Sequence, residues 1–169
     1  MPKMVDLQVT KLTWIPGDSA IADVTAPTAT VLNGGTAVDL TCLMVSSYEV
    51  RPDGSDTTNE RAVCEGANVD APTVQNYMGN AVLFRQFDDT TGAPETDDPL
   101  NIFSFGDVGY FVRRLGKPYS TVYAASDVVE VYKFMADVPQ PQGGTGEGYL
   151  KVTVPLLKQG VFSVKSIVA

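Results

Sequence analysis

The stretch Val128-Val-Glu-Val-Tyr-Lys-Phe-Met-Ala-Asp-Val138 decides the fold of this chain. It is a long run of β-branched and aromatic residues, which suits the pleated, half-buried surface of a β-strand. The run stops at Pro139-Gln-Pro-Gln-Gly-Gly-Thr-Gly-Glu-Gly148, where prolines and glycines cannot continue a strand. We therefore predict a strand over 128–138 that ends in a flexible loop.

The residues after this loop predict a returning strand. Leu150, Val152 and Val154 alternate with polar residues over 149–154, and a further short strand is predicted after Gly160. The loop is too long for a tight two-residue turn. A hairpin of this size cannot bury its apolar face alone, so it needs a partner sheet or a partner chain.

Length and composition indicate a globular chain with a single domain over residues 1–169. Hydrophobic residues make up 44% of the chain and charged residues 19%, which permits a substantial core. No stretch approaches the roughly 18 apolar residues of a membrane span, and the first residues lack the apolar region of a signal peptide. We expect no membrane partner, and we expect folding in the cytoplasm.

The chain contains no histidine, which removes Ser-His-Asp and Cys-His nucleophiles and histidine-ligated metals. The two cysteines, Cys42 and Cys64, fit no metal-ligand spacing. Buried free thiols are the favoured interpretation in a chain without an export signal, and a disulfide between neighbouring strands is the alternative.

The net charge of −8 is unevenly distributed along the chain. Residues 49–107 carry 12 acidic and 3 basic side chains, for a charge of −9, whereas residues 108–169 carry 4 acidic and 7 basic side chains, for +3. An acidic middle and a basic end permit head-to-tail self-association, although a solvated acidic loop would give the same charges. Tight binding of nucleic acid would require clustered Lys and Arg side chains, so this chain is a poor candidate for that function.

The first half of the chain predicts few regular elements. Residues 1–25 are expected to form an extended N-terminal segment with a strand over 5–15, followed by a short helix capped by Thr25 and ended by Asn33. A long strand is predicted over 38–50, and because both of its faces carry apolar residues we expect cover on both sides. Residues 51–78 are predicted to be a long, mostly irregular loop, with a short strand at Arg61–Glu65.

The second half predicts further strands and one short helix. Residues 80–87 read as a returning strand and 108–114 as another. Between them, Asp98 is a helix cap, Pro99 suits the first helical position and Gly106 follows the end of the helix. The predicted fold is mainly β, a sandwich or open barrel of about five to seven strands with one short flanking α-helix.

No catalytic or metal site emerges from the sequence. The pairs Asp53/Asp56, Asp88/Asp89 and Asp97/Asp98 lack the spacing of a calcium loop and are better explained as turn and cap residues. The glycine-rich segment 143–148 links two strands, whereas a phosphate-binding loop leads into a helix. We therefore expect neither enzymatic activity nor a cofactor.

The order of these segments resembles the tail tube (major tail) proteins of long-tailed phages with non-contractile tails, especially those infecting actinobacteria. The resemblance covers about residues 26–160. The similar stretches are Ala26–Thr36, Cys64–Gly66 with Val69–Thr73, Asn80–Asp88, Gly109–Gly116, Val128–Tyr132 and Val154–Gly160.

This resemblance implies a ring subunit and a virion protein of the tail, assembled in the host cytoplasm. Six copies would form a ring whose shared inner β-barrel takes four strands from each subunit, here 38–50, 79–87, 128–138 and 148–157. The long loop 51–78 would reach the next ring. Stacked rings would form a tube that holds the tape measure protein, meets the tail terminator and distal tail proteins, and conducts double-stranded DNA at ejection without binding it tightly.

The charge pattern assigns residues to the contact between rings. We expect the acidic loop of one copy to face the basic end of the next copy. The expected stacking residues are Arg51, Asp53, Asp56, Glu60, Glu65 and Asp70, and the expected basic counter-surface is Arg113, Arg114, Lys133, Lys151 and Lys165.

Two other classes of function remain as alternatives. A β-sandwich binding module, such as a carbohydrate-binding or adhesin domain, would need exposed aromatic residues, and Trp14 is the only tryptophan. A hydrolytic enzyme is the weakest alternative because the chain lacks histidine.

Both thiols are predicted to be reduced in protein made in the cytosol, because that compartment keeps cysteines reduced. Titration with a thiol reagent under denaturing conditions should find two free thiols per chain. Recovery of no free thiol would instead establish a disulfide between Cys42 and Cys64.

Overall fold

A computed structural model provides the structure of the chain, and it describes residues 8–61, 63–64, 66–143 and 148–169. Within these residues the chain forms one antiparallel sheet of eight strands and two helices of one turn each. The elements in chain order are β1 (Lys11–Pro16), α1 (Ala29–Leu32), β2 (Val38–Asp39), β3 (Glu49–Glu60), β4 (Val69–Phe84), α2 (Pro99–Ile102), β5 (Val108–Arg114), β6 (Val128–Ala136), β7 (Gln140–Pro141) and β8 (Lys151–Ile167).

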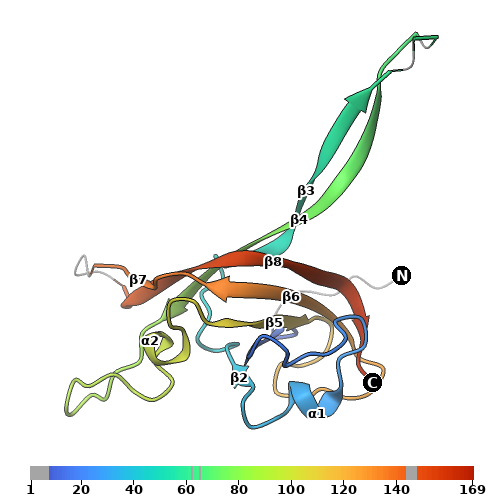
Figure 1. Cartoon of the computed structure of the whole chain (residues 1–169). Coiled ribbons are helices and arrows are strands. Elements are labelled where there is room, and N and C mark those ends of the chain that lie inside the picture. Colours follow the sequence, from blue (N-terminus) through green and yellow to red (C-terminus); the bar gives the residue numbers. More distant parts are fainter. Residues whose placement is uncertain (1–7, 62, 65, 144–147) are drawn as a thin grey trace.

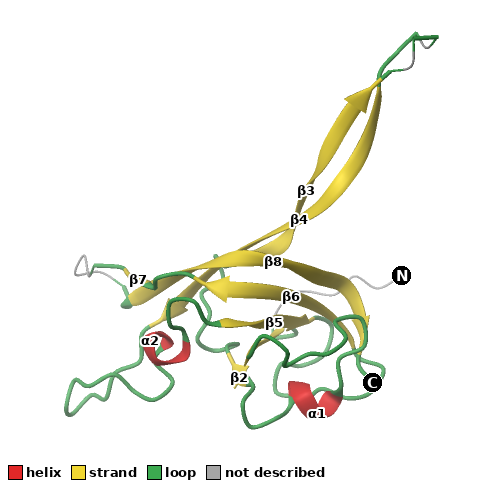
Figure 2. Cartoon of the chain, in the orientation of Figure 1, coloured by secondary structure: helices red, strands yellow, loops and turns green. Residues whose placement is uncertain are grey.

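The strand order is β2-β1-β5-β6-β8-β4-β3, and β7 pairs with the start of β8. Figures 1 and 2 show a curved sheet, with α1 and α2 below β5, β6 and β8 in this view, and a long β3–β4 hairpin that leaves the body. The predicted mainly β fold, a sandwich or open barrel with few helices, is confirmed, with eight strands instead of five to seven and two short helices instead of one in the described residues.

The central strands carry apolar side chains on both faces, and each face packs against a separate core. In β6, Tyr132, Phe134 and Ala136 enter the first core, whereas Val129 and Val131 enter the second. This alternation follows from the two-residue period of a strand. Trp14 and the α2 region complete the first core, and α1 covers the second. The apolar run that begins at Val128 therefore reflects burial on both sides.

Several predictions of individual elements are confirmed. The strands predicted over 108–114 and 128–138 appear as β5 and β6, and β6 pairs antiparallel with β8. Asp98 caps α2, since its carboxylate accepts a hydrogen bond from the Leu100 N–H at 3.0 Å. For α1 the cap is Thr28 instead of the predicted Thr25, and Asn33 ends the helix as expected.

The long strand predicted over 38–50 is wrong. β2 ends at Asp39, whose carboxylate accepts the Thr41 N–H at 2.9 Å and starts a turn. This turn carries Leu40, Leu43 and Met44 into the first core, where all three are buried. The apolar residues at both odd and even positions of 38–50 are therefore explained by a turn that buries these three side chains, and not by a strand covered on both faces.

The irregular loop predicted over 51–78 is also wrong. These residues form most of the β3–β4 hairpin, which is paired from Glu49↔Asn80 to Glu60↔Val69. The prolines, the glycine and the aspartates of this segment disfavour a β-strand locally. Pairing between the two strands overrides this weak local preference. The short strand predicted at Arg61–Glu65 is absent from the described residues, and Ala62 and Glu65 lie outside them.

Two strands predicted at the end of the chain form one strand, β8. It pairs with β6 and β7 on one side and with β4 on the other. Gly160, with a φ of +75°, lies at a shift of register between β6 and β8. Of the predicted N-terminal extended segment 1–25, residues 1–7 lie outside the described residues, and β1 lies inside the sheet between β2 and β5.

At the shift of register between β6 and β8 the two strands do not pair directly, and the Tyr77 hydroxyl bonds to a backbone group of each strand. This hydroxyl donates to the Lys133 carbonyl of β6 at 2.6 Å and accepts the Gln159 N–H of β8 at 2.7 Å. Its ring packs against Phe134 and Phe162 with centroids 5.1 and 4.9 Å apart. Burial raises the pKa of the Tyr77 hydroxyl, which therefore stays protonated and can donate. We call this contact the Tyr77 junction, and it joins β4, β6 and β8 where the hairpin leaves the sheet.

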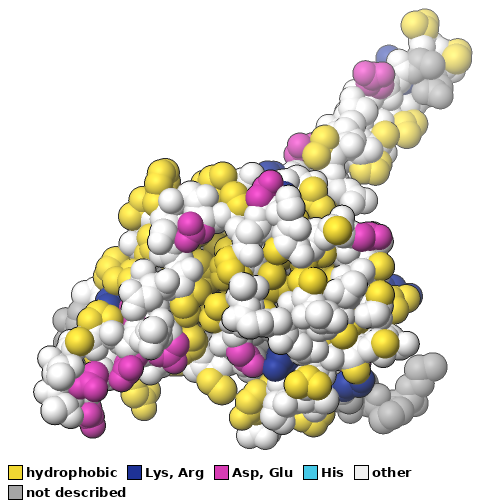
Figure 3. Space-filling view, turned by 60° about the horizontal axis from the view of Figure 1, so that its bottom comes forward, with side chains coloured by type: hydrophobic (Ala, Val, Ile, Leu, Met, Phe, Trp, Pro, Cys, Tyr) yellow, Lys and Arg dark blue, Asp and Glu magenta, His cyan; other side chains and the backbone are white. Residues whose placement is uncertain are grey.

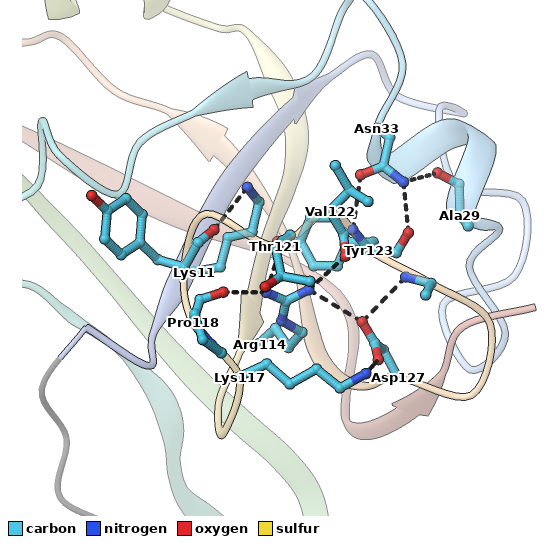
Figure 4. A network of polar contacts seen from close by, with 12 residues as sticks. Lys11, Ala29, Asn33, Arg114, Lys117, Pro118, Thr121, Val122, Tyr123 and Asp127 are labelled. Carbon is cyan, nitrogen blue, oxygen red and sulfur yellow. Dashed lines mark hydrogen bonds and ion pairs between the residues drawn. The ribbon is translucent and has the colours of Figure 1, made fainter.

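A buried ion pair orders the connection between β5 and β6 (Figure 4). The Arg114 side chain is 1% exposed and contacts the Asp127 carboxylate at 3.2 Å. It also donates to the carbonyls of Pro118, Thr121 and Val122 at 2.9–3.0 Å. Because a buried guanidinium needs many acceptors, this one side chain fixes the loop around it.

The electrostatics of Asp127 follow from the same contacts. Burial alone would raise the pKa of the Asp127 carboxyl, but donors from Lys117, Ala124 and Arg114 outweigh burial and lower that pKa. The pair therefore stabilises the fold above the ordinary pKa of 3.8, and this contribution is lost as the pH falls through the lowered value.

The predicted burial of the two cysteines is wrong, since Cys42 and Cys64 are both free and exposed. Cys42 lies in the turn after β2, and Cys64 lies in the connection between β3 and β4. Cys42 is exposed although its neighbours Leu43 and Met44 in the same turn are buried.

Replacing Gly79 by alanine is expected to destabilise the subunit by about 1–3 kcal/mol. A Cβ atom at this position would lie 2.6 Å from the buried Phe134 ring and 2.7 Å from the Leu156 Cβ. Urea denaturation measures the change. Gly54→Ala is the matched control, because a Cβ at Gly54 meets nothing within 4 Å. Equal stability of the two variants would contradict this account.

Asp127→Asn is expected to cost about 3–5 kcal/mol, because it leaves the buried Arg114 without its counter-charge. Lys117→Met should cost less than about 1 kcal/mol, since the Lys117 side chain is half exposed. Denaturation at neutral pH and at pH values below 3.8 measures both effects. The difference between Asp127→Asn and the parent should shrink at the acidic end, and a difference independent of pH would contradict the assignment.

Candidate assembly surfaces

The β3–β4 hairpin is the largest exposed feature, and we call residues 49–78 of it the arm. Figure 3 shows the arm standing clear of the body. Nearly every side chain from Arg51 to Glu60 and from Val69 to Asn76 is exposed, whereas Val50 and Tyr77 at its base are buried. A two-stranded ribbon with both faces in water is marginal by itself. The arm is therefore a surface suited to a partner.

The residues predicted to mediate stacking lie along this arm. Arg51, Asp53, Asp56 and Glu60 lie on β3 and Asp70 lies on β4, whereas Glu65 falls outside the described residues. Two of the carboxylates make hydrogen bonds within the arm. Asp56 accepts from the Asn76 amide at 3.0 Å, and Asp70 accepts from the Asn59 amide. These contacts hold the two strands together.

The structure separates the residues of the predicted basic counter-surface. Arg113 pairs with Glu130 at 2.5 Å on the face of the first core, and Lys133 pairs with Asp18 at 2.8 Å on the opposite face. Arg114 is buried in its ion pair with Asp127 and is therefore unavailable at a surface. Lys151 and Lys165 lie near opposite ends of β8. The five basic residues do not form one surface.

The outer face of β4 and β8 is only partly buried. Its side chains alternate with those of the first core, and neither helix covers it within the described residues (Figure 1). This open face combines apolar, polar and charged groups without a cluster of lysine and arginine. Its members are Glu49, Asn80, Val82, Phe84, Lys151, Thr153 and Pro155.

A shallow pocket of about 690 Å³ lies where β4 ends and β8 begins, and we call it the aromatic pocket. Phe84 and Tyr149 meet edge to face with centroids 5.5 Å apart, and the Arg85 guanidinium lies 4.6 Å from the Phe87 ring. Arg85 is held by Asp98, whose carboxylate accepts from its Nε at 2.8 Å. Sequence reasoning missed this pocket, because its two sides, residues 84–87 and 148–150, are far apart along the chain. The available signal was the recurrence of aromatic residues at 84, 87 and 149 beside the predicted turns.

The described residues show neither a candidate metal site nor a helix that could span a membrane. They contain no group of three or more acidic or cysteine side chains that could hold a metal ion. Among the same residues, no helix is long and apolar enough to cross a membrane. The features that the geometry presents are the arm, the open face and the aromatic pocket.

Comparisons with known proteins point to one family. A solved structure described as the cryo-EM structure of the anti-feeding prophage (AFP) baseplate, 6-fold symmetrised, contains a chain with a similar fold, at 13% identity and a TM-score of 0.55 over 96% of both chains. A search of curated proteins finds no significant match. The family model for phage tail tube proteins matches residues 1–169. The chain belongs to the phage tail tube protein family and is a structural, non-enzymatic component of the virion tail.

Proposed function

We propose that this protein forms hexameric rings, that the rings stack into the tail tube, and that double-stranded DNA passes along the tube during ejection. The arm is the observation that carries this proposal. It is a ribbon exposed on both faces, attached to a body whose central strands are buried on both faces. Such a ribbon gains stability only by contacting another chain.

Six-fold symmetry is supported by the similar fold of a chain in a baseplate structure described as 6-fold symmetrised. In a ring of this kind the same two surfaces meet at every junction, and the rotation closes. The resemblance to tubes of non-contractile tails supplies the remaining partners: the tape measure protein inside the tube, and the terminator and distal tail proteins at its ends. Assembly would take place in the host cytoplasm, with actinobacteria as the expected hosts.

The open face of β4 and β8 is the proposed lining of the tube. It carries Glu49 and Lys151 among apolar and neutral polar groups. Tight phosphate binding requires several clustered cations, whereas the described residues of this face carry one, Lys151, with Arg51 two residues from Glu49 at the base of the arm. DNA would therefore slide past the wall without being retained.

The alternative of a carbohydrate-binding or adhesin module receives no support from Trp14, the only tryptophan of the chain. That function would use an exposed tryptophan, and Trp14 is fully buried in the first core, where it packs on Phe103 at 5.1 Å. The tail tube is the better explanation.

Removing the outer part of the arm is expected to abolish tubes without unfolding the subunit. Asp53 and Asn76 are paired across the arm, so residues 54–75 can be replaced by an Asn-Gly turn that suits a two-residue hairpin. The Tyr77 junction and both cores remain intact. Electron microscopy measures tube formation, and circular dichroism with thermal denaturation measures folding.

A matched variant separates the shape of the arm from its charge. Asp53→Lys together with Asp56→Lys keeps the arm, and we expect it to slow stacking without preventing it, because exposed ion pairs contribute only about 0–1 kcal/mol each. Tubes of normal length from the shortened variant would show that the arm does not join rings.

A further inference from the structure

We propose that the tip of the arm of one copy binds in the aromatic pocket of a second copy, so that successive subunits associate head to tail. This inference rests on the proposed stacking of rings, and it adds the surface that receives the arm. The described residues of the tip are Arg61, Val63, Cys64, Gly66, Ala67 and Asn68, and Val69 follows at the start of β4.

The tip exposes apolar side chains to solvent. Val63 is fully exposed, Val69 is 59% exposed and the Cys64 thiol is also exposed. Water around such side chains is released when they are buried, and this release favours association. Nothing within the described part of the same subunit covers them.

The aromatic pocket has the complementary chemistry. Tyr149 is 80% exposed, Leu150 is 48% exposed and Phe87 is 38% exposed, so a large apolar area remains open. The pocket floor is held in place by the Arg85–Asp98 ion pair, in which Asp98 is completely buried. A rigid and open apolar pocket suits small branched side chains such as valine.

The tip and the pocket lie at opposite ends of the same strand. β4 begins at Val69 beside the tip and ends at Phe84 in the pocket, and its 16 residues span about 50 Å. The extended arm carries its own tip away from its own pocket (Figure 1). Contact is therefore possible only between copies. Two different surfaces that meet in this way generate an open stack when the repeated contact does not close into a ring.

The charges at the two surfaces also match. Arg61 is exposed at the tip, and the loop beside the pocket is acidic, with exposed Asp89, Glu95 and Asp97. Figure 3 shows acidic side chains gathered at the end of the body farthest from the arm. The pocket lining itself contains one cation, Arg85, whose charge is paired with Asp98, and Lys151 of β8 lies opposite Phe84. Complementary charges of this kind select the orientation of docking.

Cross-linking tests the contact directly. The variant Cys42→Ser with Gln86→Cys keeps the natural thiol at the tip and adds one in the pocket lining. A short bismaleimide applied to assembled protein should join Cys64 to position 86 and give a ladder of multiples of 18.1 kDa on a denaturing gel. The same variant with Cys64→Ser should give no ladder, and neither should Cys42→Ser with Ser46→Cys, where the new thiol lies in a different pocket.

Substitutions test the energetics. Val63→Asp and Phe87→Ala should each raise the critical concentration for tube formation about tenfold, because each removes the burial of one apolar side chain. Val122→Asp is the control, since this valine is 63% exposed outside both surfaces. Arg61→Glu should weaken assembly, and Asp89→Arg in the same chain should restore it in part.

The outcomes separate this inference from the proposed function. If tubes form normally with Val63→Asp and no ladder appears, the pocket does not receive the tip, although stacked rings remain. If the parent protein forms no rings or tubes at any concentration and no ladder appears, both the inference and the proposed function are overturned.

Discussion

The arrangement of the whole subunit depends on the Tyr77 junction. A single hydroxyl joins the Lys133 carbonyl of β6 to the Gln159 N–H of β8, at a shift of register where these strands do not pair directly. Gly79 allows the Phe134 ring and Leu156 to close over the same point. Below the junction β4 belongs to the sheet, and above it β4 pairs only with β3. The junction therefore sets where the body ends and the arm begins.

The body and the arm differ in how they are stabilised. The body buries β5 and β6 on both faces and uses the pair of Arg114 and Asp127 to order a long connection. The arm has backbone pairing and local side-chain hydrogen bonds but almost no apolar burial. The body of such a chain has its own buried core, whereas the side chains of the arm stay exposed unless another chain covers them. This is expected for a protein that functions by assembling.

The buried ion pairs explain why the distribution of charge along the chain is a poor guide to its surfaces. Arg114 contributes to the basic excess after residue 108, yet its charge is neutralised inside the subunit. Asp98 contributes to the acidic middle, yet it is buried against Arg85 beneath the aromatic pocket. The net charge of a sequence segment therefore does not give the charge of the surface that the segment forms.

The sequence alone determined the mainly β fold, the strand over 108–114, most of the strand predicted over 128–138, and the cap of α2 at Asp98. Each of these depends on local patterns: alternation along a strand, or a hydrogen bond between residues two apart. Only the tertiary structure decided that residues 51–78 form an arm, that 38–50 contains a turn that buries Leu40, Leu43 and Met44, and that Phe84 meets Tyr149. Those outcomes depend on pairing and packing between residues far apart in the chain, and such contacts leave no periodic signal in either segment.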